Sequence, residues 1–330
     1  MVWILAFTCV SKSWFVLIND PDFIEIHLNR SIKTNRERAL ISEAHKGLTP
    51  QTYYSVNFSD KKRSSKPVEI YRPFNHPGEM FNKIVGHCNG LVCLHICSFC
   101  CSFEEINKYP NYEIVIWNPL IRKYKKLPFK PIENPDDYVL KVAFGYDQIN
   151  DDYKVVWILK PRPRLASDLA SVAEVGHHVY SLRGNSWRMV EDKWPHKDLY
   201  LHMHCSASLN GALHWVAGRS GLTSAIVALD LNTEKFRMHA EYGVAASNWT
   251  WLYRLPHSPQ QTPSYSKPLA LSNNGEEVLM HEYSGKLYWY NIKKKRSRIV
   301  EIQKRKRIEE SELNFVVVGS LLLLDGELDH

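Results

Sequence analysis

Cysteine and histidine residues gather in one short stretch of this 330-residue sequence, and both side chains are zinc ligands. They are His87, Cys88, Cys93, His95, Cys97, Cys100 and Cys101. Cys97-x-x-Cys100 has the spacing of a ligand pair, but a structural zinc site usually needs a second pair. Strand alternation would place Cys93, His95 and Cys97 on one face, which is ordinary for small core residues. We therefore favour buried or loop thiols over a zinc site, and we expect no cofactor.

Two further groups of residues could do chemistry. His202-x-His204 places two imidazoles on one strand face, but no acidic ligand or general base lies at a helical offset nearby, so a polar strand edge is favoured. Asp147, Asp151 and Asp152 could act as paired carboxylates, yet aspartate is common in turns because its side chain bonds nearby backbone. The sequence has no phosphate-binding glycine loop, nucleophile elbow or His-Glu-x-x-His motif. We therefore expect no enzymatic activity and no catalytic residue.

Positive charge is concentrated near the C-terminus. The runs Lys293–Arg298 and Lys304–Arg307 resemble a bipartite nuclear import signal. The alternative is a solvated turn at a sheet edge, where lysine guards against strand addition. A net charge of +7 indicates only weak attraction to polyanions, and the sequence lacks the basic and aromatic interleaving of RNA-binding strands. We expect neither a nucleic-acid partner nor a membrane partner.

The cysteine count and the N-terminal residues bear on the compartment. Seven cysteines, an odd number, and no secretory signal before them favour a reducing, intracellular location in the cytoplasm, the nucleus or both. The apolar stretch Met1–Val10 lacks basic residues and is too short to span a bilayer.

Residues 1–31 have the periodicity of helices. Asn19-Asp20-Pro21 should end a first helix, because proline cannot continue it. Asp22 then resembles the N-cap of a second short helix, Phe23–Leu28. Two short helices make a poor core of their own, so we expect them to complete the main domain or to bind a partner. The apolar stripe of the first helix consists of Phe7, Val10, Trp14, Leu17 and Ile18.

Residues 32–67 are polar and basic, and we predict a connector with one strand, Tyr53–Phe58. From about residue 68 onwards, short runs of β-branched and aromatic residues alternate with Gly, Pro and Asn, which predicts continuous β-structure. Two late strands, Phe315–Val318 and Leu321–Leu324, are expected near the closure of the fold.

Four turns align when the apolar residue before each is compared with the residue seven positions later. The pairs are Trp117 and Tyr124, Tyr180 and Trp187, Leu229 and Phe236 and, as a weaker match, Tyr290 and Ser297. Strands opened by Asn-Gly precede three of these turns, at Asn89, Asn210 and Asn274. Units of strands that recur roughly every 50 to 60 residues are typical of a β-propeller. At roughly 45 residues per blade, the pattern predicts an all-β propeller of about six blades. A β-sandwich or two stacked barrels are the alternatives.

Tryptophans and long loops are the remaining features of the repeat region. We expect Trp117, Trp187, Trp215, Trp251 and Trp289 to pack in the core and between blades. The loops Arg162–Gly176 and Tyr242–Tyr265 are longer than hairpin loops, and long loops on a rigid scaffold often carry binding. We therefore expect a recognition surface there, although no target-binding residue can be named.

The order of these motifs resembles a known family. The segments Phe7–Trp14, Leu17–Phe23 and His27–Ser31 resemble the C-terminal half of a plant F-box. The later motifs resemble the F-box-associated domain of plant F-box/kelch-type proteins, and they are Gly86–Cys93, Trp117–Pro119, Phe144–Asp147, Asp152–Val156, Val179–Leu182, Ser186–Arg188 and Asn210–Trp215.

The resemblance implies a substrate receptor of an SCF-type (cullin-RING) E3 ubiquitin ligase. It divides the chain into a partial F-box at 1–31, a connector at 32–67 and an interaction propeller at 68–327. In that family the F-box helices dock on a Skp-type adaptor that leads to the cullin, and the propeller selects a target protein for ubiquitination. The adaptor-binding residues implied are Val10, Trp14, Leu17, Ile18 and Phe23.

One departure from the family concerns the F-box itself. The family usually has a Leu-Pro-containing helix before the Cys-Val-Ser-Lys-Ser-Trp segment, so we expect an N-terminally truncated F-box here. One alternative is then a degenerate F-box-associated protein that binds a partner without delivering ubiquitin. Another is a β-propeller enzyme, which would need acidic or metal-binding residues that converge from several blades. The repeat has no recurrent acidic position, so the enzyme ranks last.

Overall fold

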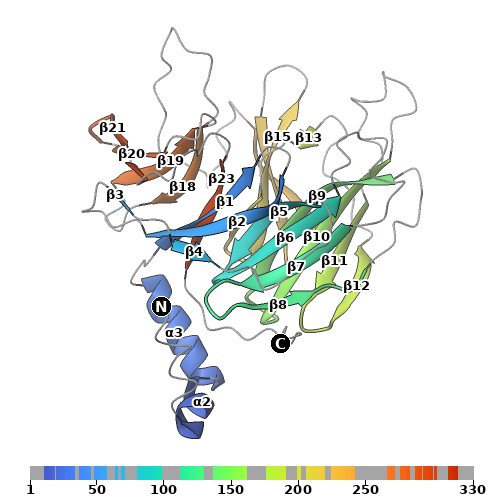
Figure 1. Cartoon of the computed structure of the whole chain (residues 1–330). Coiled ribbons are helices and arrows are strands. Elements are labelled where there is room, and N and C mark those ends of the chain that lie inside the picture. The colour runs from blue at the N-terminus through green and yellow to red at the C-terminus, as the bar shows by residue number, and fades with distance from the viewer. Residues whose placement is uncertain are drawn as a thin grey trace.

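A helical pair precedes a set of antiparallel sheets in the computed structural model (Figure 1). The helices are α2 (Lys12–Ile18) and α3 (Pro21–Lys33). The structure describes residues 11–18, 20–33, 37–45, 48–57, 64–65, 68–70, 80–98, 112–129, 137–161, 176–190, 199–201, 206–219, 224–241, 266–271, 276–282, 287–291, 293–299, 301–302 and 311–318.

Five antiparallel sheets make up most of the described chain, and we number them in sequence order. Sheet 1 has the order β23 (Ser311–Val318), β1 (Glu37–His45), β2 (Leu48–Asn57) and β4 (Val68–Ile70). Sheet 2 contains β5 (Met80–Cys88), β6 (Leu91–Ser98), β7 (Tyr112–Asn118) and β8 (Lys123–Lys126). Sheet 3 contains β9 (Asp137–Asp147), β10 (Asp152–Pro161), β11 (Gly176–Ser181) and β12 (Ser186–Val190).

The last two sheets follow the same sequential pattern. Sheet 4 contains β13 (Leu199–Leu201), β14 (Ala207–Leu209), β15 (Ala212–Arg219), β16 (Ser224–Asp230) and β17 (Phe236–Glu241), with β13 and β14 both paired to β15. Sheet 5 contains β18 (Ser266–Leu271), β19 (Glu277–Glu282), β20 (Leu287–Asn291) and β21 (Arg296–Ile299). A short parallel pair joins β3 (Ser64–Ser65) to β22 (Glu301–Ile302).

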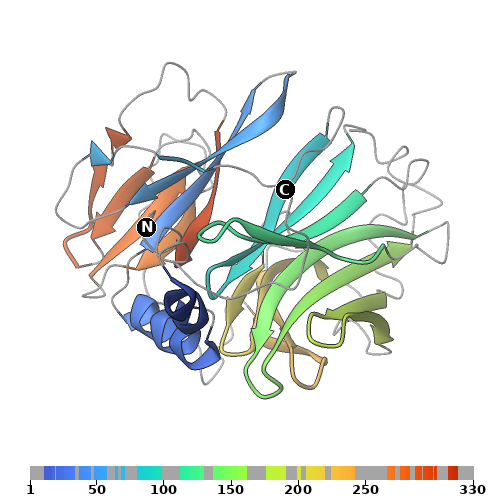
Figure 2. The ribbon, with the colours of Figure 1, turned by 60° about the horizontal axis from the view of Figure 1, so that its bottom comes forward.

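The sheets lie side by side around the molecule, with the helical pair at one side (Figure 2). The fold is therefore an all-β propeller, as the repeat predicts. Five multi-stranded sheets lie within the described ranges, and the predicted count of about six blades stays a prediction.

The two ends of the propeller chain meet in sheet 1. Strand β23 pairs antiparallel with β1, with Ala39 opposite Val316. The predicted late strand Phe315–Val318 thus lies within β23, where it completes a sheet begun near residue 37. The other late strand, Leu321–Leu324, lies outside the described residues.

The prediction of one strand in residues 32–67 was wrong. The structure forms β1, β2 and β3 there, and β2 covers Leu48–Asn57 rather than starting at Tyr53. The sequence of β1, Glu-Arg-Ala-Leu-Ile-Ser-Glu-Ala-His, has little strand signal of its own. Its partners β2 and β23 supply the pairing, and β23 comes from the far end of the chain. The boundaries of the three predicted regions stay predictions.

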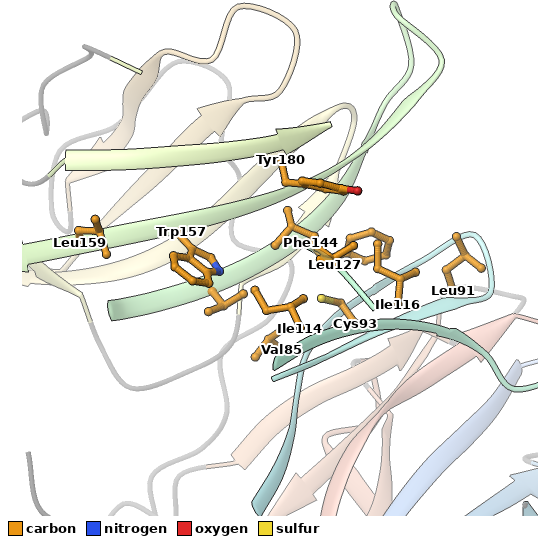
Figure 3. Packing of buried hydrophobic residues seen from close by; sticks show 12 residues of the cluster. Val85, Leu91, Cys93, Ile114, Ile116, Leu127, Phe144, Trp157, Leu159 and Tyr180 are labelled. Atoms are coloured by element: carbon orange, nitrogen blue, oxygen red, sulfur yellow. The ribbon is translucent and has the colours of Figure 1, made fainter. Parts of the chain in front are cut away.

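The central sheets are buried on both faces, which explains their nearly continuous apolar runs. In sheet 3, alternate residues of β10 point to opposite sides: Val155 and Trp157 pack against sheet 2, whereas Val156 and Ile158 pack against sheet 4. Figure 3 shows the interface between sheets 2 and 3, where Trp157, Phe144 and Tyr180 meet apolar residues of sheet 2. This packing fixes the orientation of neighbouring sheets and of the turns that join their strands.

Candidate interaction surfaces

The helical pair is held by two N-caps. The Ser11 hydroxyl accepts a hydrogen bond from the Trp14 amide at 3.2 Å, at the start of α2. The Asp20 carboxylate accepts bonds from the Asp22 and Phe23 amides at 3.0 and 3.2 Å. Asp20 is therefore the N-cap of α3, and the prediction that Asp22 caps it was wrong. Proline fits the first helical position because its missing N–H would have no partner there, so α3 begins at Pro21.

The structure places the predicted adaptor-binding residues in different environments. Trp14 and Leu17 are 45% and 47% exposed on α2, whereas Ile18 is buried. Phe23 is half-buried in the first turn of α3. Val10 lies outside the described residues. Two of the five residues thus lie on an exposed apolar surface, which is where a docking partner would find them.

Three more apolar residues of the helical pair are exposed and were missed from the sequence. Phe15 and Val16 of α2 are exposed, as is Ile26 of α3. The signal was present, because Trp14 to Ile18 is an uninterrupted apolar run. At 100° per residue such a run covers every side of a helix, and one neighbouring helix cannot bury them all. Helical periodicity singles out one apolar stripe of such a run and leaves the other apolar residues unassigned.

The four turns aligned in the sequence share one backbone structure. Each predicted seven-residue pair forms a cross-strand partner pair in the structure: Trp117 with Tyr124, Tyr180 with Trp187, Leu229 with Phe236, and Tyr290 with Ser297. The sequence offset therefore measures a four-residue hairpin loop. The residue five positions after the first member has a positive φ in every case, and these residues are Arg122, Asn185, Glu234 and Lys295.

The residue directly after the first member of each pair caps the turn. Side-chain oxygens accept hydrogen bonds from loop amides, as aspartate, asparagine and serine do in such turns. The bonds are Leu120 N to Asn118 Oδ1, Gly184 N to Ser181 Oγ, Asn232 N and Thr233 N to Asp230 Oδ1, and Lys294 N to Asn291 Oδ1. The repeat is thus a cap, a left-handed residue and a cross-strand pair at fixed offsets.

A fifth turn has the same structure, and the sequence predicted a turn here but did not align it with the other four. Tyr146 and Tyr153 are cross-strand partners seven residues apart, and Asp151 has a φ of 49°. Asp147 Oδ1 accepts bonds from the Ile149 and Asn150 amides at 3.1 and 3.2 Å. The signal was the Tyr-to-Tyr spacing, which lies at the start of sheet 3 rather than at its end.

Asp147 also belongs to a buried ion cluster between sheets 3 and 4. Lys154 Nζ donates to Asp147 Oδ2 at 2.8 Å, to Glu234 Oε1 at 3.0 Å and to the Leu231 carbonyl at 2.5 Å. Lys154 and Glu234 are 4% and 2% exposed. Arg188 forms a further ion pair with Glu234. Burial works to raise the pKa of Asp147, but hydrogen bonds from Lys154 and Asn150 outweigh it and hold that pKa below its ordinary value.

The other carboxylates of the predicted turn cluster are also engaged. Asp152 accepts bonds from the Ser181 hydroxyl at 2.5 Å and from the Arg183 amide at 2.9 Å. Asp151 accepts the Tyr146 hydroxyl at 2.5 Å. The interpretation that these aspartates bond nearby groups in turns is confirmed, and Asp152 also joins its turn to the β11–β12 loop.

The cysteines whose side chains are described, Cys88 and Cys93, pack in the core. Cys93 is fully buried between sheets 2 and 3, and Cys88 is half-buried beside it. Burial raises the pKa of the Cys88 thiol to about 11 and that of Cys93 further, which disfavours the thiolate that zinc needs. No group of three or more potential ligands comes together in the ranges described. Cys100 and Cys101 lie outside them.

The structure describes four of the five tryptophans, and these pack as predicted, in the core or between sheets. Trp117, Trp215 and Trp289 are buried. Trp187 is half-buried and donates its indole N–H to the Pro128 carbonyl at 2.9 Å, so it fastens β12 to the chain that follows β8. Trp251 lies outside the described residues, and so do His202, His204 and the predicted recognition loops 162–175 and 242–265.

The first basic run, Lys293–Arg298, forms the β20–β21 turn and the start of β21. Its lysines are exposed at a sheet edge, in agreement with the solvated-turn interpretation. The second run, Lys304–Arg307, lies outside the described residues, so the import signal stays a prediction. No helix in the ranges described is long and apolar enough to cross a membrane.

The profile of the F-box associated beta propeller domain matches residues 43–253 of the chain. The chain therefore belongs to the family of proteins that carry this domain. F-box protein CPR1 of Arabidopsis thaliana is 27% identical over 380 aligned residues, which cover 97% of this chain and 85% of CPR1. An F-box/kelch-repeat protein of the same plant is 28% identical over 254 residues, covering 70% of this chain and 58% of that protein.

The chain spans little more than half of several such relatives, for example 54% of a putative F-box protein that is 27% identical. Among solved structures, the Dos1 propeller overlaps with a TM-score of 0.30 at 11% identity, over 78% of this chain and 57% of that one. An overlap this loose carries no argument about function.

Proposed function

We propose that this protein is a substrate receptor of an SCF-type E3 ubiquitin ligase. Its helical pair docks on a Skp-type adaptor that leads to the cullin, and its propeller binds a target protein for ubiquitination. The receptor does no bond chemistry of its own. Membership of the F-box-associated family supports this role, and so do relatives that are named F-box proteins.

The observation that carries the proposal is the exposed apolar surface of the helical pair. Trp14, Phe15, Val16 and Leu17 follow one another along α2 and are all exposed. Burial of apolar surface contributes about 25 cal/mol per Å², and a tryptophan often dominates an interface. Two short helices that leave these side chains in water are better explained as half of an interface than as a self-contained core.

Adaptor binding can be measured with the purified chain and a purified Skp-type adaptor. We expect Trp14→Ala with Leu17→Ala to weaken binding at least about tenfold, because truncation of an apolar anchor commonly costs about 2 kcal/mol. Alanine keeps the helix propensity, so α2 should still form. Ile149→Ala is the matched control, since Ile149 is an exposed aliphatic residue on a propeller turn.

Three results separate the alternatives. Loss of binding in the helix variant but not in the control supports the receptor. Equal binding by all three proteins would place the adaptor elsewhere. If the native chain does not bind but a chimera with the N-terminal F-box segment of CPR1 does, the chain is a partner-binding protein without a ligase link.

A further inference from the structure

The β20–β21 turn carries a dense group of positive charges. Five of the six residues from 293 to 298 are Lys or Arg. The side chains of Lys293 to Arg296 are exposed, and that of Arg298 is half-buried. We call the turn and β21 together the basic hairpin. Its charge is held on a fixed backbone, because Asn291 Oδ1 accepts the Lys294 amide at 2.8 Å.

Two neighbouring glutamates neutralise only part of this charge. Lys293 Nζ pairs with Glu276 Oε1 at 2.9 Å, and Arg298 Nη2 pairs with Glu277 Oε2 at 3.4 Å. The charges left over in the described part of the hairpin are those of Lys294, Lys295 and Arg296. Opposite charges of a partner could therefore be bound here without breaking an existing ion pair.

Strand β21 also offers hydrogen-bonding groups. It is the last strand of sheet 5, and among the described residues it pairs with β20 alone. An edge strand presents a row of backbone N–H and C=O groups that can pair with an extended chain. Ile299, at the end of β21, is exposed and would add an apolar contact.

A segment of the same chain already pairs with the strand that follows β21 in sequence. Ser64–Ser65 form β3, which runs parallel to Glu301–Ile302 of β22, two residues after β21 ends. The sequence around β3 reads Lys-Lys-Arg-Ser-Ser-Lys, so the pairing belongs to a second basic stretch far away in the sequence. The β3–β22 pair thus links a segment near residue 64 to the residues that directly follow β21.

We propose that the basic hairpin binds an extended acidic segment of a partner protein, which pairs with β21 and places carboxylates against Lys294, Lys295 and Arg296. A nucleic acid fits less well, because it cannot pair with a strand edge. The aromatic residues of β20 also offer little for base stacking, since Trp289 and Tyr290 are buried. The inference gives the propeller a class of partner and does not depend on adaptor binding, so the two proposals can fail separately.

The test is the binding of a fluorescent glutamate-rich 12-residue peptide to the full chain, measured by anisotropy. We expect the variant Lys294→Gln, Lys295→Gln, Arg296→Gln to bind about tenfold more weakly and with a smaller dependence on salt. The matched control is Arg122→Gln, Lys123→Gln, Lys125→Gln, which removes the same charge from the β7–β8 turn and the strand β8 that follows it. It should change the affinity less than about twofold. Unchanged melting curves for both variants show that folding is not the cause.

Three outcomes would overturn the proposal. Equal weakening in the two variants would mean attraction by net charge alone. Tighter binding of a single-stranded oligonucleotide of equal charge would mean a nucleic-acid surface. Unchanged binding of a peptide N-methylated at alternate residues would show that β21 does not pair with it, because N-methylation removes the amide donors.

Discussion

The β16–β17 and β20–β21 turns have the same backbone but use their charged residues in opposite ways. In the first, the left-handed residue is Glu234, which is buried and paired with Lys154 and Arg188. In the second, it is Lys295, which is exposed. The loop geometry repeats because the capping oxygen and the cross-strand pair repeat. The charge of the left-handed residue, by contrast, differs from turn to turn.

The difference separates a turn that holds the fold from a turn that is open to a partner. The Glu234 carboxylate pairs with Lys154 of the neighbouring sheet 3, so its charge is neutralised inside the molecule. The charges of the basic hairpin face water and reach only local glutamates. A repeat protein can thus use the same hairpin in several sheets and still give one of them a binding surface.

The largest expected effect is at Lys154. Lys154→Met leaves the Asp147 and Glu234 carboxylates buried without this partner, which should lower the free energy of unfolding by about 3–5 kcal/mol. Lys294→Met removes an exposed charge from the other turn and should change it by less than about 0.5 kcal/mol. Urea unfolding of the two variants measures both values. Similar losses would mean that the two turns do not differ as described.

A glycine at the left-handed position should act with opposite signs in the two turns. Lys295→Gly relieves an unfavourable φ of 51° and should stabilise the protein by about 0.5 kcal/mol after the entropy cost of glycine. Glu234→Gly relieves the same kind of backbone strain but removes a carboxylate from Lys154, so it should destabilise by about 2 kcal/mol or more. Thermal melts would show the sign directly, and a gain in both variants would contradict the buried role of Glu234.

The pH dependence of the free energy of unfolding should also depend on the buried cluster of Asp147, Lys154 and Glu234. The expected effect is smaller than that of the substitutions above. The pKa of Asp147 is lower in the folded protein than its ordinary value of about 4. The folded state therefore binds fewer protons in this range, and stability rises with pH there. The contribution of Asp147 to stability is complete above its ordinary pKa. It is lost as the pH falls through the lower pKa that Asp147 has in the folded protein.

Lys154→Met should flatten or reverse this slope, since burial without the lysine raises the pKa of Asp147. Lys294→Met should leave the slope unchanged. Urea unfolding from pH 7 down to about pH 3 compares the two variants with the native chain. Parallel curves would mean that Lys154 does not set this titration.

The repeat was readable from the sequence because its signals are local. The offset from Trp117 to Tyr124 spans one hairpin, and the Asn89-Gly90 turn follows from two residues whose φ values, 50° and 83°, suit a two-residue loop. Turn spacing within single hairpins therefore predicted units of antiparallel strands and the fold class. The Tyr146–Tyr153 turn carries the same seven-residue spacing and could have been aligned with the other four.

Contacts between distant segments could not be predicted in this way. Strand β1 becomes a strand because β23, from the opposite end of the chain, pairs with it. Lys154 lies in a run of apolar strand residues, and its partner Glu234 is 80 residues away. The exposure of Phe15 and Val16 likewise depends on how much of α2 the neighbouring helix covers, which no local pattern reveals.

Hydrogen exchange of the full chain with and without the acidic peptide tests the contrast between the two turns most directly. We predict that amides of residues 231–235 exchange slowly in both states, because their turn is held by buried ion pairs. Amides of residues 293–299 should exchange faster in the free protein and become protected when the peptide is present. If the peptide slows exchange in both turns, or in neither, the result would contradict the assignment of one turn to the fold and the other to a partner.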